Sequence, residues 1–347
     1  MGELYHEKHK DVIIDKYKEY IASMPAFVKS YFTFYEITKN ASADTILSYA
    51  YDLDTFFYFL TQENPTVETY KDITLELLDS LTMQDIQEYL SFLVKYQKNG
   101  VVYKNSEVGR ARKLASLRSF YKYYQTIEKS IKNNPAGVIP MPKLKQKDVI
   151  ALTRKEIQDV LNEVATANNF SKHQKAYTDK THYRDMALIT LLLGTGIRVS
   201  ECVGINLTDI DKEEQSIFIH RKGNKESRIF YGEAVADALN TYIELERKKI
   251  NTEEPALFLS LKGTRISVRS VERIVKKYSS AAVTTKKITP HKLRSTYGTN
   301  LYGETGDALV VKDALGHSNI SVVQKYVKAD ENARKEASKM ADSWLNE

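Results

Sequence analysis

The sequence predicts a mainly α-helical protein with a small β-sheet, an α+β fold divided into two domains. Apolar side chains recur at helical spacing through residues 1–130, and residues 133–148 then interrupt the pattern with three prolines, a glycine and several lysines. Residues 210–232 alternate apolar and polar side chains around a turn, as a β-hairpin does. Two domains are expected because a single core rarely grows beyond roughly 250–300 residues, and this chain has 347.

The first domain is expected to be an all-helical bundle over residues 1–135. Ser42 is a suitable N-cap for the helix after it, because a serine hydroxyl accepts a hydrogen bond from a free backbone N–H. The apolar periodicity predicts helices at 42–62, 83–97 and 106–129, and one or two further helices within 5–35.

A linker is expected at 136–150, followed by a second domain at 151–347. Thr153 and Glu156 form a capping-box pattern, which predicts a helix over 154–166. An apolar helix is expected at 184–194, then the hairpin, and then a region that is again mostly helical.

The charge is unevenly distributed along the chain. The net charge is +6 overall, but it is −9 within 41–90, +10 within 91–150 and +9 within 261–300. Two basic blocks favour a polyanionic partner such as nucleic acid, although solvated helix faces explain them equally well. The single cysteine excludes an internal disulfide, and neither an apolar membrane span nor a signal-peptide core is seen. We therefore expect a cytoplasmic protein without a membrane partner.

Two groups of basic residues at helical spacing are candidates for contacts with DNA phosphates or with the major groove. A charged helix face without a function is an equally good explanation of the first group. The first group comprises Arg110, Arg112, Lys113 and Arg118, and the second comprises Arg265, Arg269, Arg273 and Lys276.

Common metal and nucleotide motifs are missing from the sequence. There is no P-loop, no GxGxxG, no HExxH, no CxxC and no obvious carboxylate cluster of the kind that holds the ions of a metal-dependent nuclease. We therefore expect no metal and no cofactor, and any phosphodiester chemistry would be metal-independent.

Several polar fragments of the second domain are ordinary when taken singly. Arg198 follows a glycine-flanked turn, Lys222 sits in the hairpin turn, and Pro290 begins a helix that would place His291 and Arg294 on one face. A surface arginine or an exposed turn lysine is the usual explanation of such residues. The last fragments are Gly316-His317 and, nine residues after the histidine, Tyr326.

In this order the fragments resemble the catalytic set of the tyrosine recombinases. Residues 195–201 (TGIRVSE) are similar to the first arginine box of that family, and 290–294 (PHKLR) to the second. Residues 315–318 (LGHS) are similar to the third box, and Tyr326 stands at the position of the nucleophile. The sequence departs from the family at Ser295, where histidine or lysine is frequent.

The resemblance implies a helical, SAM-like core-binding domain and a catalytic domain that form a C-shaped clamp on double-stranded DNA. It implies a site-specific recombinase that cleaves and rejoins strands through a 3′-phosphotyrosyl intermediate. A homo-oligomer on DNA, a tetrameric synapse of two dimers, is also implied. The context of the second box is closest to the XerS-like branch of the Xer recombinases, in which one recombinase works alone.

The resemblance also assigns roles that suit the chemistry. Arg198 and Arg294 would hold the non-bridging phosphate oxygens through forked hydrogen bonds. Tyr326 would attack the phosphorus, since a phenol with a pKa of about 10 is also a competent leaving group in the return reaction. Tyr297 is the nearest rival nucleophile in the sequence, and we expect it to have a packing role.

The remaining catalytic candidates would move protons or orient other groups. Lys222 would protonate the departing 5′-oxygen, and His291 would handle the tyrosine proton. His317 would donate a hydrogen bond to a phosphate oxygen. Glu201 would support the basic groups, although an ordinary carboxylate at a helix start explains it nearly as well.

Three functions fit this reading. The first is Xer-type resolution of chromosome dimers, with a role in chromosome partition and cell division. The second is integration of a mobile element by the same chemistry. The third is a DNA-binding protein on this fold that has lost catalysis, which the complete residue set argues against. Type IB topoisomerases share the chemistry but do not exchange strands between duplexes.

Overall fold

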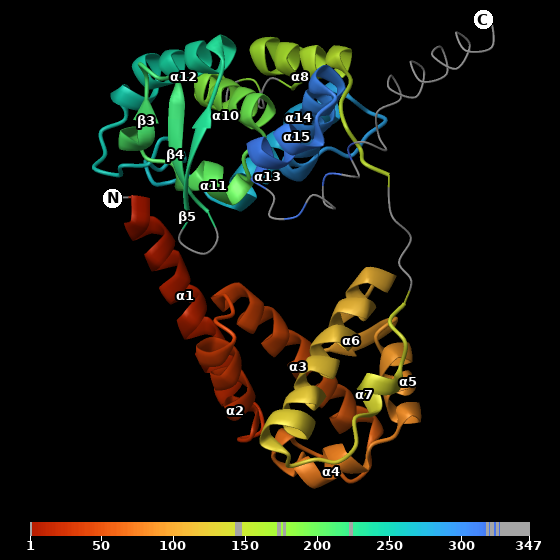
Figure 1. Cartoon of the computed structure of the whole chain (residues 1–347). Helices are drawn as coiled ribbons and strands as arrows, with labels where there is room; N and C mark the ends of the chain where they lie inside the picture. Colours follow the sequence, from red (N-terminus) through yellow and green to blue (C-terminus); the bar gives the residue numbers. More distant parts are fainter. Residues whose placement is uncertain are drawn as a thin grey trace, which may run out of the picture. The chain divides into compact units, whose positions relative to one another are not determined.

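The structure is a computed structural model that describes residues 2–142, 148–171, 175, 178–221, 225–316, 319, 323 and 326 (Figure 1). The chain divides into two compact units. The N-terminal unit comprises Glu7–Gln146, and the C-terminal unit comprises Met1–His6 together with Lys147–Glu347. Each unit has its own hydrophobic core.

The N-terminal unit is mainly helical. Ser42 has extended backbone angles directly before α3, in the predicted N-cap position, but its hydroxyl pairs with that of Thr45 at 2.9 Å and does not accept the predicted hydrogen bond from a backbone N–H. The helices are α1 (Gly2–Ala22), α2 (Val28–Thr33), α3 (Ala43–Glu63), α4 (Leu75–Ser80), α5 (Met83–Phe92), α6 (Glu107–Lys122) and α7 (Pro135–Val138), with irregular turns η1 (Phe34–Thr38), η2 (Tyr70–Asp72) and η3 (Tyr123–Glu128).

Aromatic rings fill the centre of this unit. Phe57, Phe120 and Tyr124 are buried, and Phe27 packs edge-on against Phe57 and Tyr124 with ring centroids 6.5 and 5.8 Å apart. Edge-to-face packing of this kind adds to the stabilisation that burial alone provides. The core fixes α3 against α6, the helix that carries the first basic group.

The helix predicted at 83–97 is shorter than expected. It ends at Phe92, and two antiparallel strands follow, β1 (Lys95–Lys98) and β2 (Val101–Lys104). Asn99 and Gly100 form the connecting turn with φ of 51° and 75°. Two consecutive positive φ angles are typical of the tight hairpin turns that Asn-Gly favours.

Part of the region predicted as a linker belongs to the N-terminal unit. Pro135–Val138 forms α7, whose first residue is a proline and whose N-cap, Asn134, accepts a hydrogen bond from Gly137 N–H. Ala136 and Ile139 are buried in the core of the unit. The prediction of no regular structure at 133–148 is therefore wrong for its first half, and residues 143–147 lie outside the described residues.

The C-terminal unit combines helices with a small sheet. The sheet is antiparallel, in the order β3-β4-β5. Its elements are α8 (Arg154–Thr166), α10 (His182–Thr195), α11 (Val199–Gly204), η4 (Leu207–Asp209), β3 (Ile210–Asp211), β4 (Ser216–Arg221), β5 (Lys225–Phe230), α12 (Glu233–Leu245), η5 (Arg247–Lys249), α13 (Val268–Ala282), α14 (Pro290–Thr305) and α15 (Ala308–Leu315).

The helices of this unit pack around α10. That helix contacts α8, α12 and α14, and α14 in turn contacts α15. Thr153 and Glu156 form the predicted capping box at the start of α8. A mainly helical fold with small sheets is confirmed, and no helix in the described part of the chain is long and apolar enough to cross a membrane.

Candidate active site

Arg198 is placed by a turn that requires glycine. Helix α10 ends at Thr195 and is capped by Gly196, whose φ is 62°, and a Cβ on this glycine would lie 2.5 Å from Cδ1 of Tyr297. Arg198 then caps α11 together with Glu201: its backbone N–H donates to Oε2 and its Nη1 to Oε1, both at 2.7 Å. The Glu201 side chain is buried, whereas 42% of the Arg198 side chain is exposed. Glu201 thus orients a guanidinium group that remains open to a ligand.

Arg294 is buried and joins two turns of the fold. Its Nη1 donates to the carbonyl oxygen of Gly196 at 2.7 Å, and its Nη2 donates to that of Leu315 at 2.5 Å. Only 3% of the residue is exposed. Helix α14, which begins at Pro290 as predicted, supplies Arg294 from its second turn and His291 one turn earlier, exposed at the surface.

Tyr326 lies in a small apolar cluster with Val311, Leu315 and Val323, and it is fully buried. Helix α14 approaches its ring closely, because a Cβ at Gly298 would lie 3.1 Å from Cζ and 3.2 Å from Cε2. A larger residue at Gly298 would therefore press against the ring.

The electrostatic surroundings of the phenol come from the two predicted arginines. Burial raises the pKa of Tyr326 above its ordinary value, whereas Arg294, the nearby Ser295 side chain and Arg198 each lower it. Contacts of Arg294 place the three residues in one region, because it bonds the carbonyl oxygens of Gly196, two residues before Arg198, and of Leu315, which packs with Tyr326. Tyr326 follows Arg198 by 128 positions in the sequence. A phenol beside two guanidinium groups is suited to attack on a phosphate that those groups hold.

Two predicted catalytic residues, Lys222 and His317, lie outside the described residues. Strands β4 and β5 flank residues 222–224, so the hairpin predicted around the lysine is present. Helix α15 ends at Leu315, and Gly316 follows with a φ of 61°, which gives the predicted turn directly before His317.

The basic group on α6 differs from the open stripe that the sequence suggests. Asp52 of α3 accepts hydrogen bonds from both terminal nitrogens of Arg112, at 2.6 and 2.7 Å, and from Lys113 Nζ at 3.0 Å. Lys113 is buried, and Arg118 donates to the carbonyl oxygens of Gly137 and Ile139. Of these four side chains, only that of Arg110 makes no hydrogen bond or ion pair with the described part of the chain.

The second basic group has three exposed members on α13, and Arg265 is not one of them. Arg265 precedes α13, and its guanidinium donates to the carbonyl oxygens of Val203 and Ile205 at 2.9 and 3.1 Å. Only 8% of its side chain is exposed, so Arg265 is not part of an exposed helical stripe. The other three members, Arg269, Arg273 and Lys276, lie on α13 and are exposed.

Ser295 and Gly298 lie at the site although no site role was expected for either of them. Ser295 is buried beside the phenol, and Gly298 leaves room for its ring. Both residues follow Arg294 on α14, and this closeness to the second box is the feature of the sequence that could have indicated a role at the site. Among the described residues, no group of three or more His, Cys, Asp or Glu side chains could hold a metal ion.

Two family models match separate parts of the sequence. The phage integrase family model matches residues 151–333, and the model of the phage integrase N-terminal SAM-like domain matches residues 28–126. The chain belongs to the phage integrase family. The members of this family are the tyrosine recombinases that the order of Arg198, Arg294 and Tyr326 resembles.

Curated relatives place the recombinase in the Xer group. It is 35% identical over 323 residues to the tyrosine recombinase XerC of Caldanaerobacter subterraneus, covering 90% of this chain and 86% of that protein. It is 30% identical to XerC of Bacillus subtilis, with 86% and 90% covered, and 30% identical to XerD of Staphylococcus epidermidis, with 87% and 94% covered. The protein is a Xer-type tyrosine recombinase, and its activity is site-specific recombination.

Solved structures share its fold. A XerH recombinase bound to a palindromic difH substrate aligns with a TM-score of 0.66 at 19% identity, covering 88% of this chain and 82% of that one. A λ integrase dimer bound to a COC′ core site aligns with a TM-score of 0.62 at 15% identity, with 89% and 96% covered. The expectation of a Xer-type recombinase is confirmed, and the XerS-like assignment stays a prediction.

Proposed function

We propose that this recombinase cleaves DNA with Tyr326 and holds the cut strand as a 3′-phosphotyrosine. The observation that carries the proposal is the pair of hydrogen bonds made by Arg294: one reaches the carbonyl oxygen of Gly196, two residues before Arg198, and the other reaches that of Leu315, whose side chain packs with Tyr326. The two arginines come from different helices, and only the tertiary fold brings them to one tyrosine among the 23 in the chain.

The proposed reaction assigns each group to one atom of the phosphodiester. The Tyr326 oxygen bonds to phosphorus, and the bond from phosphorus to the 5′-oxygen breaks. His291 takes the phenolic proton, and Lys222 gives a proton to the departing 5′-oxygen. Arg198, Arg294 and His317 hold the non-bridging oxygens, where negative charge develops; removing one such donor typically costs about 10²–10³-fold in rate. Rejoining is the same sequence in reverse.

The phenol is fully buried in this structure, so the reaction includes a change of position. Tyr326 is held by the small cluster with Val311, Leu315 and Val323, and not by the main core of the unit. We expect the phenolic oxygen to move toward a phosphate that sits against the exposed part of Arg198.

The two units have separate roles in the proposal. The N-terminal unit as far as Ile139 forms the core-binding domain, the residues between Ile139 and Ala151 form the linker, and 151–347 form the catalytic domain; together they clamp double-stranded DNA. The separate family matches at 28–126 and 151–333 support this division. The solved relatives are named as complexes with DNA, which supports double-stranded DNA as the partner. Four protomers, as two dimers, would assemble two DNA sites into one synapse.

The biological role that we favour is resolution of chromosome dimers. The curated relatives named XerC and XerD favour it. Integration of a mobile element is the second candidate, favoured by a fold likeness to the Tn1549 transposon integrase, with a TM-score of 0.62 at 21% identity.

Selection of genomic fragments that the protein binds, followed by sequencing, separates the two roles. A single site near the replication terminus is the expected result, and sites that flank the recombinase gene itself would instead show an integrase. Two duplexes that carry the selected site should then yield joined products. Relaxation of supercoils without joined products would contradict recombination.

A further inference from the structure

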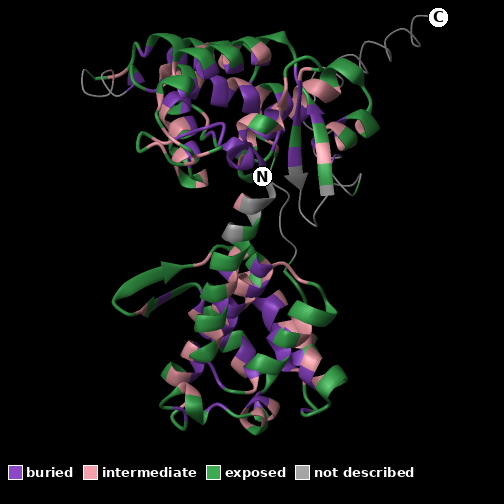
Figure 2. Ribbon diagram, turned by 90° about the vertical axis from the view of Figure 1, so that its left-hand side faces the viewer, coloured by how far each residue is buried: buried purple, intermediate pink, exposed green. Residues whose placement is uncertain are grey.

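The β1–β2 hairpin stands out from the helices of the N-terminal unit, with most of its length exposed (Figure 2). Its strand register divides the side chains between two faces. The inner face carries the pairs Tyr96–Tyr103 and Lys98–Val101, and the outer face carries Lys95–Lys104 and Gln97–Val102. All four side chains of the outer face are exposed.

Contacts at the base of the hairpin hold it in place. The Asn105 side chain donates to the carbonyl oxygen of Leu93 at 2.8 Å, and Tyr58 Oη donates to that of Gln97 at 2.9 Å. The rings of Phe92 and Tyr96 stack at 4.8 Å, and that of Tyr103 stacks on Tyr96 at 5.2 Å. The hairpin is thus a fixed extension of α5 and α3.

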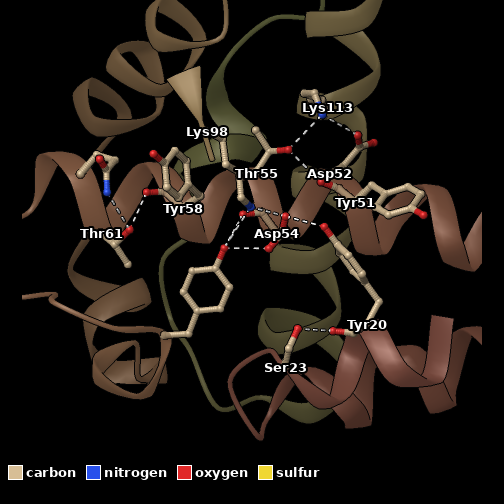
Figure 3. A network of polar contacts seen from close by, with 12 residues as sticks. Tyr20, Ser23, Tyr51, Asp52, Asp54, Thr55, Tyr58, Thr61, Lys98 and Lys113 are labelled. Atoms are coloured by element: carbon tan, nitrogen blue, oxygen red, sulfur yellow. Dashed lines mark hydrogen bonds and ion pairs between the residues drawn. The ribbon is translucent and has the colours of Figure 1, made fainter. Parts of the chain in front are cut away.

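An ion pair on the inner face adds to this anchoring. Lys98 donates to the Asp54 carboxylate at 2.5 Å and lies over the Tyr58 ring (Figure 3). Asp54 also accepts hydrogen bonds from Tyr20 and Tyr70, at 2.8 and 2.7 Å. The inner lysine is therefore paired with a carboxylate inside the protein, as Lys113 and Arg112 are with Asp52.

The outer face carries two lysines that are not paired in this way. Lys95 and Lys104 are directly opposite each other across the strands, and neither ammonium makes a hydrogen bond or an ion pair with the described residues. Like charges in directly opposed positions destabilise a strand pair. A bound polyanion would remove this repulsion, and a hairpin anchored from its inner face holds the two charges in position for one.

We propose that the β1–β2 hairpin is a rigid arm that binds the phosphate backbone of duplex DNA through Lys95 and Lys104. The inference rests on the proposed function, which supplies DNA as the partner. In the predicted basic group on α6, three of the four cations already donate to Asp52 or to backbone carbonyl oxygens. The proposal therefore assigns the main phosphate contacts of this unit to the hairpin that precedes α6. Contacts to phosphates do not depend on base sequence, so the arm would contribute equally at any site.

The salt dependence of binding tests the arm. Each phosphate contact releases counterions, so the number of contacts sets the slope of log Kd against log salt concentration. The double variant Lys95→Gln, Lys104→Gln should lower this slope by about 2 on a mixed-sequence duplex, measured by fluorescence anisotropy. The variant with Lys95→Arg and Lys104→Arg should keep the full slope, because the charges remain.

A matched control removes two exposed lysines from elsewhere in the same unit, Lys18→Gln with Lys71→Gln. Three results would contradict the proposed arm. They are an unchanged slope in the Lys→Gln hairpin variant, an equal fall of the slope in the control, and no binding of the duplex by the unaltered chain. If the hairpin binds an acidic protein and not DNA, the Lys→Gln variant should show an unchanged salt dependence of DNA binding. If the unaltered chain forms no covalent adduct but the hairpin variant still loses slope, the cleavage proposal fails and the arm stands.

Discussion

Arg198 and Arg294 have different physical surroundings although both are assigned to the same phosphate. Arg294 is buried and donates to two backbone carbonyl oxygens, so it holds the site together. Arg198 is half-exposed and pairs with Glu201. Loss of the guanidinium group should therefore lower the stability of the fold at Arg294 and not at Arg198.

Arg294→Lys and Arg198→Lys should both reduce DNA cleavage by about 10²-fold or more, because a lysine cannot form the forked contact. Only Arg294→Lys should also destabilise the fold, by about 1–3 kcal/mol, since it leaves a buried carbonyl without its donor. Single-turnover cleavage and calorimetric unfolding measure the two effects. Equal losses of stability in both variants would contradict the structural role of Arg294.

Ser295 tunes the nucleophile in this account. Its side chain lowers the pKa of the Tyr326 phenol against the effect of burial, so Ser295→Ala should raise that pKa further. At pH values below the pKa of the Tyr326 phenol, the phenolate fraction rises with pH in the same proportion in the unaltered enzyme and in Ser295→Ala. The variant should therefore cleave up to about tenfold more slowly from neutral pH upward. The deficit should narrow only as the pH reaches and passes the ordinary phenol value of about 10.

A pH profile of single-turnover cleavage checks this prediction. Ser295→Thr keeps a hydroxyl and should retain the rate of the unaltered enzyme. A deficit in Ser295→Ala that stays constant even at the most alkaline pH would assign Ser295 a packing role instead.

The order of the catalytic residues was readable from the sequence, and so was Glu201 as a support for Arg198. The partners of the predicted DNA-binding residues were not. Arg198, Arg294 and Tyr326 stand at recognisable spacings. No feature of the sequence indicates that Asp52, some 60 residues away on α3, pairs with Arg112 and Lys113, or that carbonyl groups hold Arg265. Such pairings depend on which helices pack together, and helical periodicity carries no information on that.

Helix α14 positions the nucleophile through a close approach at Gly298. Gly298→Ala adds a Cβ that would lie 3.0 Å from Cδ1 of Leu315 and 3.1 Å from the Tyr326 ring, so both must shift by a few tenths of an ångström. We expect about a tenfold loss of cleavage, since small misplacements of reacting groups are costly. Stability should change by no more than about 1 kcal/mol, because alanine favours the helix.

Gly109→Ala is the control for this change. Gly109 also lies in a helix, and a Cβ there meets no atom closer than 3.6 Å. With protein in excess over DNA, cleavage by this variant should match that of the unaltered chain. Full activity in Gly298→Ala would show that the ring does not depend on the approach of α14.

The packing of α3 on α6 depends on Asp52. Burial raises the pKa of this carboxyl, whereas Lys113 and Arg112 lower it. Asp52→Ala leaves the buried Lys113 ammonium without a carboxylate and should cost about 3–5 kcal/mol. Arg112→Gln should cost less than about 1 kcal/mol, since half of that side chain is exposed. Calorimetric unfolding of the full chain measures both, and similar costs would contradict the buried pairing.

The elements that the sequence predicted best are those with strong local signals. Thr153 with Glu156 and Pro290 each mark a helix start that the structure confirms. The helix at 83–97 was drawn too long because its apolar period runs on past Phe92, although Asn99-Gly100 signals a hairpin turn. Helix α7 was missed because its stability comes from burial of Ala136 against other helices, and not from its own four residues.

The molecule as a whole combines two units that have different tasks. The C-terminal unit holds Arg198, Arg294 and Tyr326 in one cluster, and the N-terminal unit offers the hairpin lysines, Lys95 and Lys104, to DNA. Binding and cleavage should therefore be separable. Changes in the hairpin lysines should alter the salt dependence of affinity, whereas changes in the arginines should alter the rate at saturating protein.

The most direct test of the account identifies the residue that carries the DNA. A nicked substrate traps the covalent complex, and trypsin divides the candidate tyrosines between peptides, with Tyr326 in 326–328 and both Tyr297 and Tyr302 in 295–312. Mass spectrometry should find the nucleotide on the peptide 326–328, and Tyr326→Phe should bind the substrate without forming the adduct. A nucleotide on 295–312 or on any other peptide would contradict the assignment of Tyr326 as the nucleophile.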